Sequence, residues 1–162
     1  MNVAFLCLGG NIGNRKFTLK QAVEKINNEI GKVVSQSNYY ETEAWGVENQ
    51  DKYLNQCICV ETILPSNQVL KKSLAIELSL GRKRNHKETY EPRTIDIDML
   101  FYNFESIQTK DLSIPHPRLH LRKFVLIPLN EIAPNFVHPV LNKTIHTLLL
   151  ECEDNCEVLI YK

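Results

Sequence analysis

The chain has 162 residues, of which 43% are hydrophobic, and it carries 19 acidic and 19 basic residues. This composition suits one compact domain whose core needs no disulfide or metal for stability. The zero formal net charge argues against a dedicated nucleic-acid binder, although it does not exclude local phosphate sites.

The termini and cysteines indicate the compartment. No basic flank or cleavage segment marks the first residues, and no stretch reaches the ~20 apolar residues of a membrane span. Among the five cysteines, Cys7, Cys57 and Cys59 lie in apolar, strand-like segments typical of a core. Cys152 and Cys156 lie in an acidic tail, where a single pair of cysteines is only weak evidence for a metal site. We expect a cytoplasmic, reduced protein without a membrane or nucleic-acid partner.

The first half of the chain predicts alternating strands and helices. An apolar run over residues 3–8, ending at two glycines, predicts a buried strand. Helical spacing of apolar residues predicts a helix over 17–30, which Gly31 ends. Residues 32–42 predict one strand, and residues 43–52 a loop. Alternation over 53–64 predicts a second long strand.

The second half begins with a helix that follows Pro65 and ends at Gly81. Its predicted buried stripe consists of Val69, Leu70, Leu74, Ile76 and Leu80. Residues 82–93 form a charged loop long enough to predict a functional lid. A strand over 94–102 leads to a hairpin tip at Asn103. Turns and short helices over 115–139, a helix over 144–150 and a strand over 158–161 complete the chain.

The order of these elements predicts the fold class. Strand, helix, two strands, helix and strand form the split βαβ pattern of ferredoxin-like folds. We therefore expect an α+β protein with a ferredoxin-like βαββαβ core, additional strands and helices, and a mostly antiparallel sheet. Without repeats or a linker, residues 1–162 predict a single domain.

The strand over residues 94–102 carries two aspartates. Side chains two residues apart share a face, so Asp96 and Asp98 project together while Ile95, Ile97 and Met99 face the core. Their Cα atoms are then about 6.6 Å apart. Two such carboxylates can share a pair of Mg²⁺ ions, as in phosphoryl transfer. Taken alone, the pattern also suits ordinary alternation on a half-exposed strand.

The neighbours of the aspartates favour the metal site. Aspartate is a poor strand former, yet two aspartates lie within an otherwise apolar strand. Arg93 precedes them, and the loop before it carries Arg82 and Arg84. Carboxylates that hold metal beside arginines that hold phosphate oxygens predict a nucleotide-phosphate site.

Several segments together resemble the 6-hydroxymethyl-7,8-dihydropterin pyrophosphokinase family along nearly the whole chain. They are LGGN (8–11), YLN (53–55), PRTIDIDML (92–100), IPHP (114–117), RKFVLIPL (122–129) and EIAP (131–134). The resemblance implies a monomeric enzyme of folate biosynthesis that transfers pyrophosphate from ATP to the pterin, releasing AMP. The sequence departs from the family pattern at Gly10, Tyr90 and Glu91, and over residues 43–45, and these departures concern the loops, not the reaction class.

The resemblance also implies a role for individual residues. The catalytic residues would be Arg82, Arg93, Asp96 and Asp98, with the two aspartates as ligands of two Mg²⁺ ions. The ATP-binding residues would be Glu77, Arg84, Met99, Ser113, His116 and Arg122. The pterin-binding residues would be Thr42, Trp45, Tyr53, Asn55 and Phe124.

Two other functions stay open at this point. A non-catalytic ligand- or RNA-binding module would suit the predicted fold, but it gives no reason for paired strand aspartates. Another Mg²⁺-dependent nucleotidyl or phosphoryl transferase would explain the aspartates, but not Tyr53, Asn55 and Phe124 together. Taken singly, Tyr53 and Phe124 also suit positions in the core.

Overall fold

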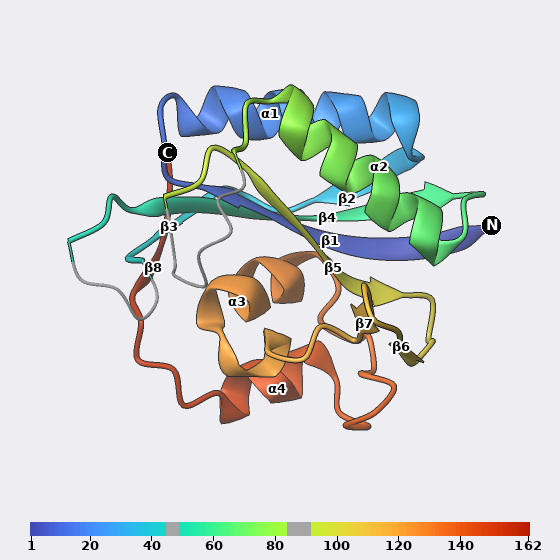
Figure 1. Ribbon diagram of the computed structural model, residues 1–162. Coiled ribbons are helices and arrows are strands. Elements are labelled where there is room, and N and C mark those ends of the chain that lie inside the picture. The colour runs from blue at the N-terminus through green and yellow to red at the C-terminus, as the bar shows by residue number, and fades with distance from the viewer. Residues whose placement is uncertain (45–48, 84–91) are drawn as a thin grey trace.

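The computed structural model describes residues 1–44, 49–83 and 92–162, and it places one large sheet between two layers of helices (Figure 1). The central strands β1 (Asn2–Gly10) and β4 (Tyr53–Thr62) pair antiparallel over nine positions. β5 (Asp96–Tyr102) pairs with the other edge of β1. β2 (Lys32–Gln36) and β3 (Tyr40–Thr42) both pair with β4, and β8 (Val158–Ile160) extends the sheet beyond β3.

This topology confirms the predicted fold class. Helix α1 (Arg15–Glu29) connects β1 to β2, and helix α2 (Ser66–Ser79) connects β4 to β5. The spatial order β5-β1-β4, followed by β2 and β3, is that of a ferredoxin-like βαββαβ core, with every described pairing of its sheet antiparallel. The β8 strand, the β6–β7 hairpin and the C-terminal helices are additions to this core.

Helices α1 and α2 cover one face of the sheet (Figure 1). Asn14 caps α1, because its side chain accepts a hydrogen bond from the Phe17 backbone N–H at 3.2 Å. The helix ends before Gly31, where a Cβ atom would lie 2.2 Å from the Glu61 carbonyl oxygen. Glycine therefore lets the chain pass close to β4 as it enters β2. The core on this side contains apolar side chains of α1, α2, β1, β4 and β5.

Helices α3 (Lys123–Ile132) and α4 (Ile145–Glu151) lie on the opposite face (Figure 1). They bury a second core that includes Phe5, Phe101 and Leu126. A short 3-10 helix, η1 (Leu119–Leu121), precedes α3, and a small hairpin of β6 (Ile107–Gln108) and β7 (Ser113–Ile114) follows β5. The turns and short helices predicted over 115–139 thus include a ten-residue helix.

The structure differs from the predicted elements in two places. The single strand expected over residues 32–42 is wrong, because the pairing shifts register between Val33 and Ser35 and residues 37–39 leave the strand. Leu70, Leu74 and Leu80 of the predicted buried stripe are only half-buried, and the first two line a cavity beside α2. Most of the predicted lid, residues 84–91, lies outside the described residues. No helix within the described ranges has the length and apolar character needed to cross a bilayer.

Candidate active site

Two cavities meet at the start of β5. The larger, of about 940 Å³, lies between α2, β5 and the β6–β7 hairpin. The smaller, of about 230 Å³, is lined by residues of β1, β3, β4 and the start of α3. Both are lined by Arg93, Asp96, Asp98 and His116. A molecule in one cavity therefore reaches the same four side chains as a molecule in the other.

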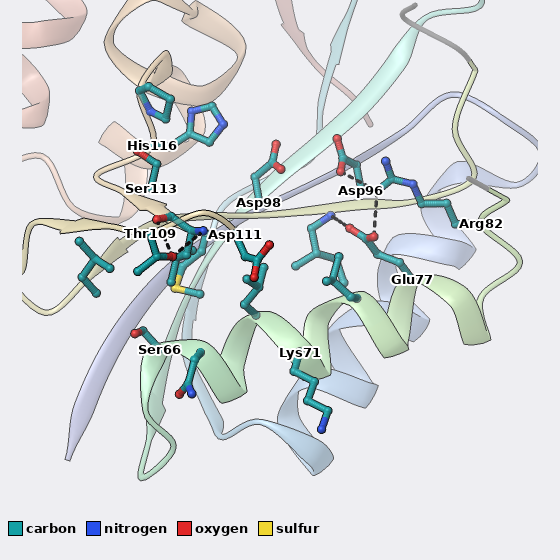
Figure 2. Close-up of a pocket in the computed structure, with 18 of the residues that line it drawn as sticks. Ser66, Lys71, Glu77, Arg82, Asp96, Asp98, Thr109, Asp111, Ser113 and His116 are labelled. Carbon is teal, nitrogen blue, oxygen red and sulfur yellow. Dashed lines mark hydrogen bonds and ion pairs between the residues drawn. The ribbon is translucent and has the colours of Figure 1, made fainter. Parts of the chain in front are cut away.

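The two aspartates have the predicted alternation. Ile95, Ile97 and Met99 are buried in the core, whereas Asp96 and Asp98 are half-buried on the other side of the strand. Figure 2 shows the two carboxylates pointing to the same side of β5. The period of two along a strand accounts for this arrangement.

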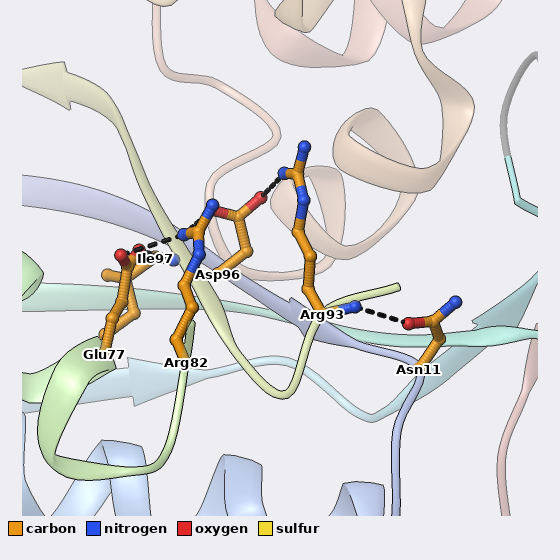
Figure 3. Close-up of polar contacts among 6 residues, drawn as sticks. All are labelled: Asn11, Glu77, Arg82, Arg93, Asp96 and Ile97. Atoms are coloured by element: carbon orange, nitrogen blue, oxygen red, sulfur yellow. Dashed lines mark hydrogen bonds and ion pairs between the residues drawn. The ribbon is translucent and has the colours of Figure 1, made fainter. Parts of the chain in front are cut away.

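Asp96 is held by two arginines (Figure 3). Its Oδ1 accepts a hydrogen bond from Arg82 Nη1 at 2.9 Å, and its Oδ2 accepts one from Arg93 Nη1 at 2.6 Å. Arg82 Nη1 also lies 2.8 Å from Glu77 Oε2. The buried Glu77 carboxylate accepts a hydrogen bond from the Ile97 backbone N–H at 2.8 Å, so α2 is tied to β5 through this network. Charge-assisted contacts of this kind fix side chains more firmly than neutral ones.

Asp98 lies in a different electrostatic environment. Burial first, and then the negative charges of Asp96 and Glu77, raise its pKa from 3.8 to about 7, against lowering by Arg93 and Arg122. A carboxylate whose charge is disfavoured in this way gains from a nearby cation. The charge on this side of β5 is therefore incompletely neutralised by the protein.

The donor set fits Mg²⁺ shared with a phosphate ligand. Within the described ranges, no group of three or more His, Cys, Asp or Glu side chains forms a complete metal cage. Mg²⁺ is commonly held by one or two carboxylates together with water and substrate phosphates, not by an all-protein cage. The adjacent carboxylates of Asp96 and Asp98, open to the larger cavity, supply those protein ligands.

His116 is a neutral hydrogen-bond donor in the shared wall. Burial, and next the charge of Arg122, lower its pKa to about 4, with Arg118 adding to this effect. Its Nδ1 accepts a hydrogen bond from the Arg118 backbone N–H at 3.2 Å. Because Nδ1 is an acceptor, the ring proton is on Nε2, which can donate to a ligand oxygen.

The smaller cavity combines polar and aromatic side chains. The buried Asn55 donates a hydrogen bond from Nδ2 to Thr42 Oγ1 at 3.0 Å, which fixes the orientation of its amide. Gly9 on β1 is the ladder partner of Asn55 and leaves room for its side chain, because a Cβ atom at Gly9 would lie 2.7 Å from Asn55 Oδ1. Phe124 lines the cavity with the Arg122 guanidinium 5.6 Å from its ring centroid. Such a lining suits a flat ring with polar edges.

Asn11 fixes the position of Arg93 (Figure 3). The Arg93 backbone N–H donates to Asn11 Oδ1 at 2.8 Å, and the Asn11 backbone N–H donates to the Arg93 carbonyl at 2.9 Å. Asn11 Nδ2 also donates to the Asp51 carbonyl at 3.1 Å. The end of β1 thus holds the segment that leads into β5.

The structure gathers most of the predicted site residues around the two cavities. Those along the larger cavity are Glu77, Arg82, Arg93, Asp96, Asp98, Met99, Ser113 and His116. Those along the smaller cavity include Thr42, Tyr53, Asn55 and Phe124. Arg122, predicted to contact the nucleotide, lines the smaller cavity instead. Trp45 and Arg84 lie outside the described residues.

The sequence interpretation missed one wall of the larger cavity. Asn67 and Lys71 of α2, and Thr109 and Asp111 of the β6–β7 hairpin, line it. The i,i+4 spacing of Asn67 and Lys71 puts both on one face of the helix, which is the signal that was available. Nothing local in the sequence places the hairpin opposite that face.

The chain is similar to known pterin pyrophosphokinases. Residues 5–134 match the 7,8-dihydro-6-hydroxymethylpterin-pyrophosphokinase (HPPK) family. A 2-amino-4-hydroxy-6-hydroxymethyldihydropteridine pyrophosphokinase of Aquifex aeolicus is 42% identical over 145 residues, covering 88% of each chain. One of Bacillus subtilis is 41% identical over 133 residues, covering 82% of this chain and 78% of the relative.

The fold is also similar to solved structures. Wild-type HPPK-DHPS of Plasmodium falciparum with pteroate has a TM-score of 0.74 at 18% identity. The match covers 93% of this chain but 44% of that longer chain, so this chain spans less than half of it. At this identity the likeness concerns the fold alone.

Proposed function

Because the chain belongs to the 7,8-dihydro-6-hydroxymethylpterin-pyrophosphokinase family, we propose that its two adjoining cavities hold the two substrates of one transfer. The enzyme transfers pyrophosphate from ATP to 6-hydroxymethyl-7,8-dihydropterin in tetrahydrofolate biosynthesis, giving AMP and the pterin diphosphate. ATP occupies the larger cavity and the pterin the smaller one. The observation that carries this assignment is the shared wall of Arg93, Asp96, Asp98 and His116.

The pterin assignment rests on the chemistry of the smaller cavity. A flat bicyclic ring packs against Phe124 and Tyr53, and aromatic faces hold such rings well. Asn55 presents an acceptor oxygen beside Thr42, and amide groups read the donors and acceptors at a ring edge. The hydroxymethyl group then points toward the shared wall, where the transfer occurs.

The metal assignment rests on the unequal environments of the two aspartates. Asp96 and Asp98 would hold Mg²⁺, for which we propose two ions, and these would neutralise and orient the triphosphate. Asp98 gains most from a cation, because its charge is disfavoured in the protein alone. With Asp96 as a metal ligand, Arg82 and Arg93, which donate to its carboxylate in this structure, would donate to phosphate oxygens.

The remaining residues position the nucleotide. His116 donates from Nε2 to a phosphate or ribose oxygen, and Arg122 adds positive charge from the smaller cavity. Backbone near Met99 and Ser113 meets the adenine. Glu77 acts through Arg82, which it holds in place from α2. Such a site works by positioning and charge neutralisation, so no covalent nucleophile is required.

The products test the proposed reaction. Purified protein is incubated with ATP, Mg²⁺ and hydroxymethyldihydropterin, and the nucleotides and pterins are separated by chromatography. We expect AMP and the pterin diphosphate in equal amounts, and no AMP without the pterin. ADP with a pterin monophosphate would show that the attacked phosphorus is not the β-phosphorus.

Several properties of the whole protein are also proposed. We infer a single domain over residues 1–162, a monomer, a cytoplasmic location and no nucleic-acid ligand. The zero net charge supports the last point. Light scattering after size exclusion tests the monomer, and a gel-shift assay with single-stranded RNA tests the absence of nucleic-acid binding.

A further inference from the structure

Two cysteines lie opposite each other beneath the smaller cavity. Cys7 of β1 and Cys57 of β4 are direct partners in the antiparallel ladder between the two central strands. Cys7 lines the cavity and is 6% exposed, whereas Cys57 is fully buried below α3. The Cys57 thiol donates to the Val125 carbonyl at 3.7 Å. The pair therefore has one member that a small molecule can reach and one that it cannot.

The backbone shows that this is the closely spaced kind of cross-strand pair. The Cys57 carbonyl accepts from the Ser37 backbone N–H at 2.9 Å, and the Cys57 N–H donates to Ser37 Oγ at 3.0 Å. Both backbone groups of Cys57 therefore point away from β1, so Cys7 and Cys57 are a non-hydrogen-bonded pair. In such pairs the Cα atoms are about 4.5 Å apart. Disulfides span Cα distances of about 4.4–6.8 Å, so a bond can close with little backbone movement.

The two thiols also contact each other directly. A side-chain hydrogen bond with Cys57, followed by burial, raises the pKa of the Cys7 thiol well above its usual value of 9.0. The carboxylates of Asp98 and Asp96 add to this increase. The cross-strand geometry therefore places Cys7 Sγ within reach of the Cys57 thiol.

We propose that Cys7 and Cys57 form a dithiol in the floor of the smaller cavity, in which Cys57 removes adducts that form on Cys7. The Cys7 thiolate attacks a small disulfide, which forms a mixed disulfide and releases one thiolate. Cys57 then attacks Cys7 Sγ, which closes the Cys7–Cys57 bond and releases the second thiolate. The small disulfide is the oxidant: it gains two electrons, and the two thiol protons leave with its two halves.

This chemistry has a consequence for the substrate. An adduct on Cys7 would occupy the cavity of about 230 Å³ that the proposed function assigns to the pterin, and this part of the inference rests on that assignment. Closure of the Cys7–Cys57 bond clears the adduct from the cavity. The dithiol would thus keep the pterin site accessible in the presence of small disulfides.

The experiment detects the bond by peptide mapping. Trypsin leaves Cys7 in residues 1–15, but it leaves Cys57 together with Cys59 in residues 53–71. The Cys59→Ala variant is therefore the background, and it is treated with 2-hydroxyethyl disulfide at about pH 8.5, where thiol–disulfide exchange is faster than at neutral pH. We expect a disulfide between the two peptides and no hydroxyethylthio group on Cys7. If this cross-link does not form in the Cys59→Ala protein, that result alone overturns the proposal.

Two variants test the role of each thiol. In the Cys59→Ala/Cys57→Ala protein, we expect the adduct to remain on Cys7, because nothing removes it. In the Cys59→Ala/Cys7→Ala protein, Cys57 should stay unmodified, since it is fully buried. Equal retention of the adduct with and without Cys57 would show that Cys57 does not resolve it. A denaturation curve of each variant confirms that the fold is intact before treatment.

Pterin binding separates this proposal from the proposed function. Calorimetry should find that the Cys59→Ala/Cys57→Ala protein with the adduct on Cys7 no longer binds the pterin, and that dithiothreitol, which removes the adduct, restores binding. The cross-linked protein should still bind the pterin. If the adduct is retained but pterin binding is unchanged, the pterin does not occupy this cavity, and the dithiol chemistry stands. If the cross-link is absent but ligand binding is normal, the dithiol proposal fails and the proposed function stands.

Discussion

Replacing Asp98 by Asn should stabilise the metal-free protein, whereas replacing Asp96 by Asn should destabilise it. Asp96 accepts hydrogen bonds from Arg82 at 2.9 Å and from Arg93 at 2.6 Å, and the amide of Asn cannot neutralise either arginine. Asp98 instead has a raised pKa, because its half-buried carboxylate loses solvation and lies near the charges of Asp96 and Glu77. Asparagine has almost the same shape as aspartate and removes this unfavourable charge.

The pKa of Asp98 sets the size of the effect. A rise from 3.8 to about 7 corresponds to a ceiling of about 4 kcal/mol in the free energy of unfolding, at about 1.36 kcal/mol per unit. Solvent in the open cavity screens part of this energy, so we expect Asp98→Asn to add about 1–2 kcal/mol at pH 8. That gain raises Tm by about 2–8 °C for a chain of this size. Asp96→Asn should lower the stability by about 1–3 kcal/mol, since two charged hydrogen bonds are lost.

The dependence on pH has a definite sign. Below its unfolded pKa of 3.8, Asp98 is protonated in both states and carries no penalty. Between 3.8 and about 7 the unfolded chain ionises while the folded chain keeps the proton. The Asp98 contribution to the free energy of unfolding therefore falls as the pH rises through this window, and it stays low above pH 7. The Asp98→Asn variant should lack this decline.

Urea denaturation in EDTA between pH 4 and pH 8 measures these differences for the wild type and both variants. The decline is read as the difference between wild type and Asp98→Asn at each pH, so that other titrating groups cancel. Two results would refute the environments assigned to Asp96 and Asp98. One is a difference in unfolding free energy between wild type and Asp98→Asn that does not change with pH. The other is a change in stability of the same sign in both variants. Both variants should also lose at least ~100-fold in turnover, because each removes a preorganised metal ligand.

Two further predictions concern the smaller cavity and the end of β1. Phe124→Ala and Asn55→Ala should each weaken pterin binding several-fold, since an aromatic contact or a polar edge contact is worth about 1 kcal/mol, and leave ATP binding nearly unchanged in calorimetry. Loss of ATP affinity with pterin affinity retained would mean that the subsites are exchanged. Asn11→Ala should lower kcat by about 10-fold, because it removes Asn11 Oδ1, which accepts a hydrogen bond from the Arg93 backbone N–H at 2.8 Å. The control Asn11→Asp keeps an acceptor oxygen at this position and should retain more activity. Equal kcat values for the two Asn11 variants would contradict this role.

The sequence predicted those parts of the molecule that depend on local periodicity. Asp96 and Asp98 share a side of β5 because a strand repeats every two residues, and the surrounding apolar residues face the core for the same reason. The order of strands and helices likewise follows from local patterns, and it was enough to predict the ferredoxin-like core. The break in the strand over 32–42 was missed, because the Asn38 backbone N–H is satisfied by the distant Glu131 side chain at 3.0 Å.

The charges of the site could not be predicted from spacing alone. Nothing in the sequence indicates that Arg82 and Arg93 both reach Asp96, or that Asp98 has a raised pKa beside it. The support of Arg93 by Asn11 joins residues 82 positions apart, and it depends on how β1 and β5 pair. Such contacts arise from tertiary packing, so a motif can give the residue types but not their partners.

The shared wall between the cavities predicts coupling between the substrates. Four residues line both cavities, so a ligand that reorders Arg93 and Asp96 in one changes the site that the other ligand meets. We expect a non-hydrolysable ATP analogue with Mg²⁺ to raise pterin affinity by about 5- to 150-fold, the usual range for coupled sites. Thermodynamic linkage requires that the pterin raise the affinity for the analogue by the same factor.

A calorimetric cycle measures this coupling, with each ligand titrated in the presence and absence of the other. The matched control is Lys71→Ala, since Lys71 lines only the larger cavity and lies outside the shared wall. This variant should weaken binding of the analogue while leaving the coupling factor unchanged, whereas Asp96→Asn should reduce the factor toward one. A wild-type factor of one would mean that the two ligands do not meet at the shared wall, and the assignment of the cavities to one transfer would fail with it.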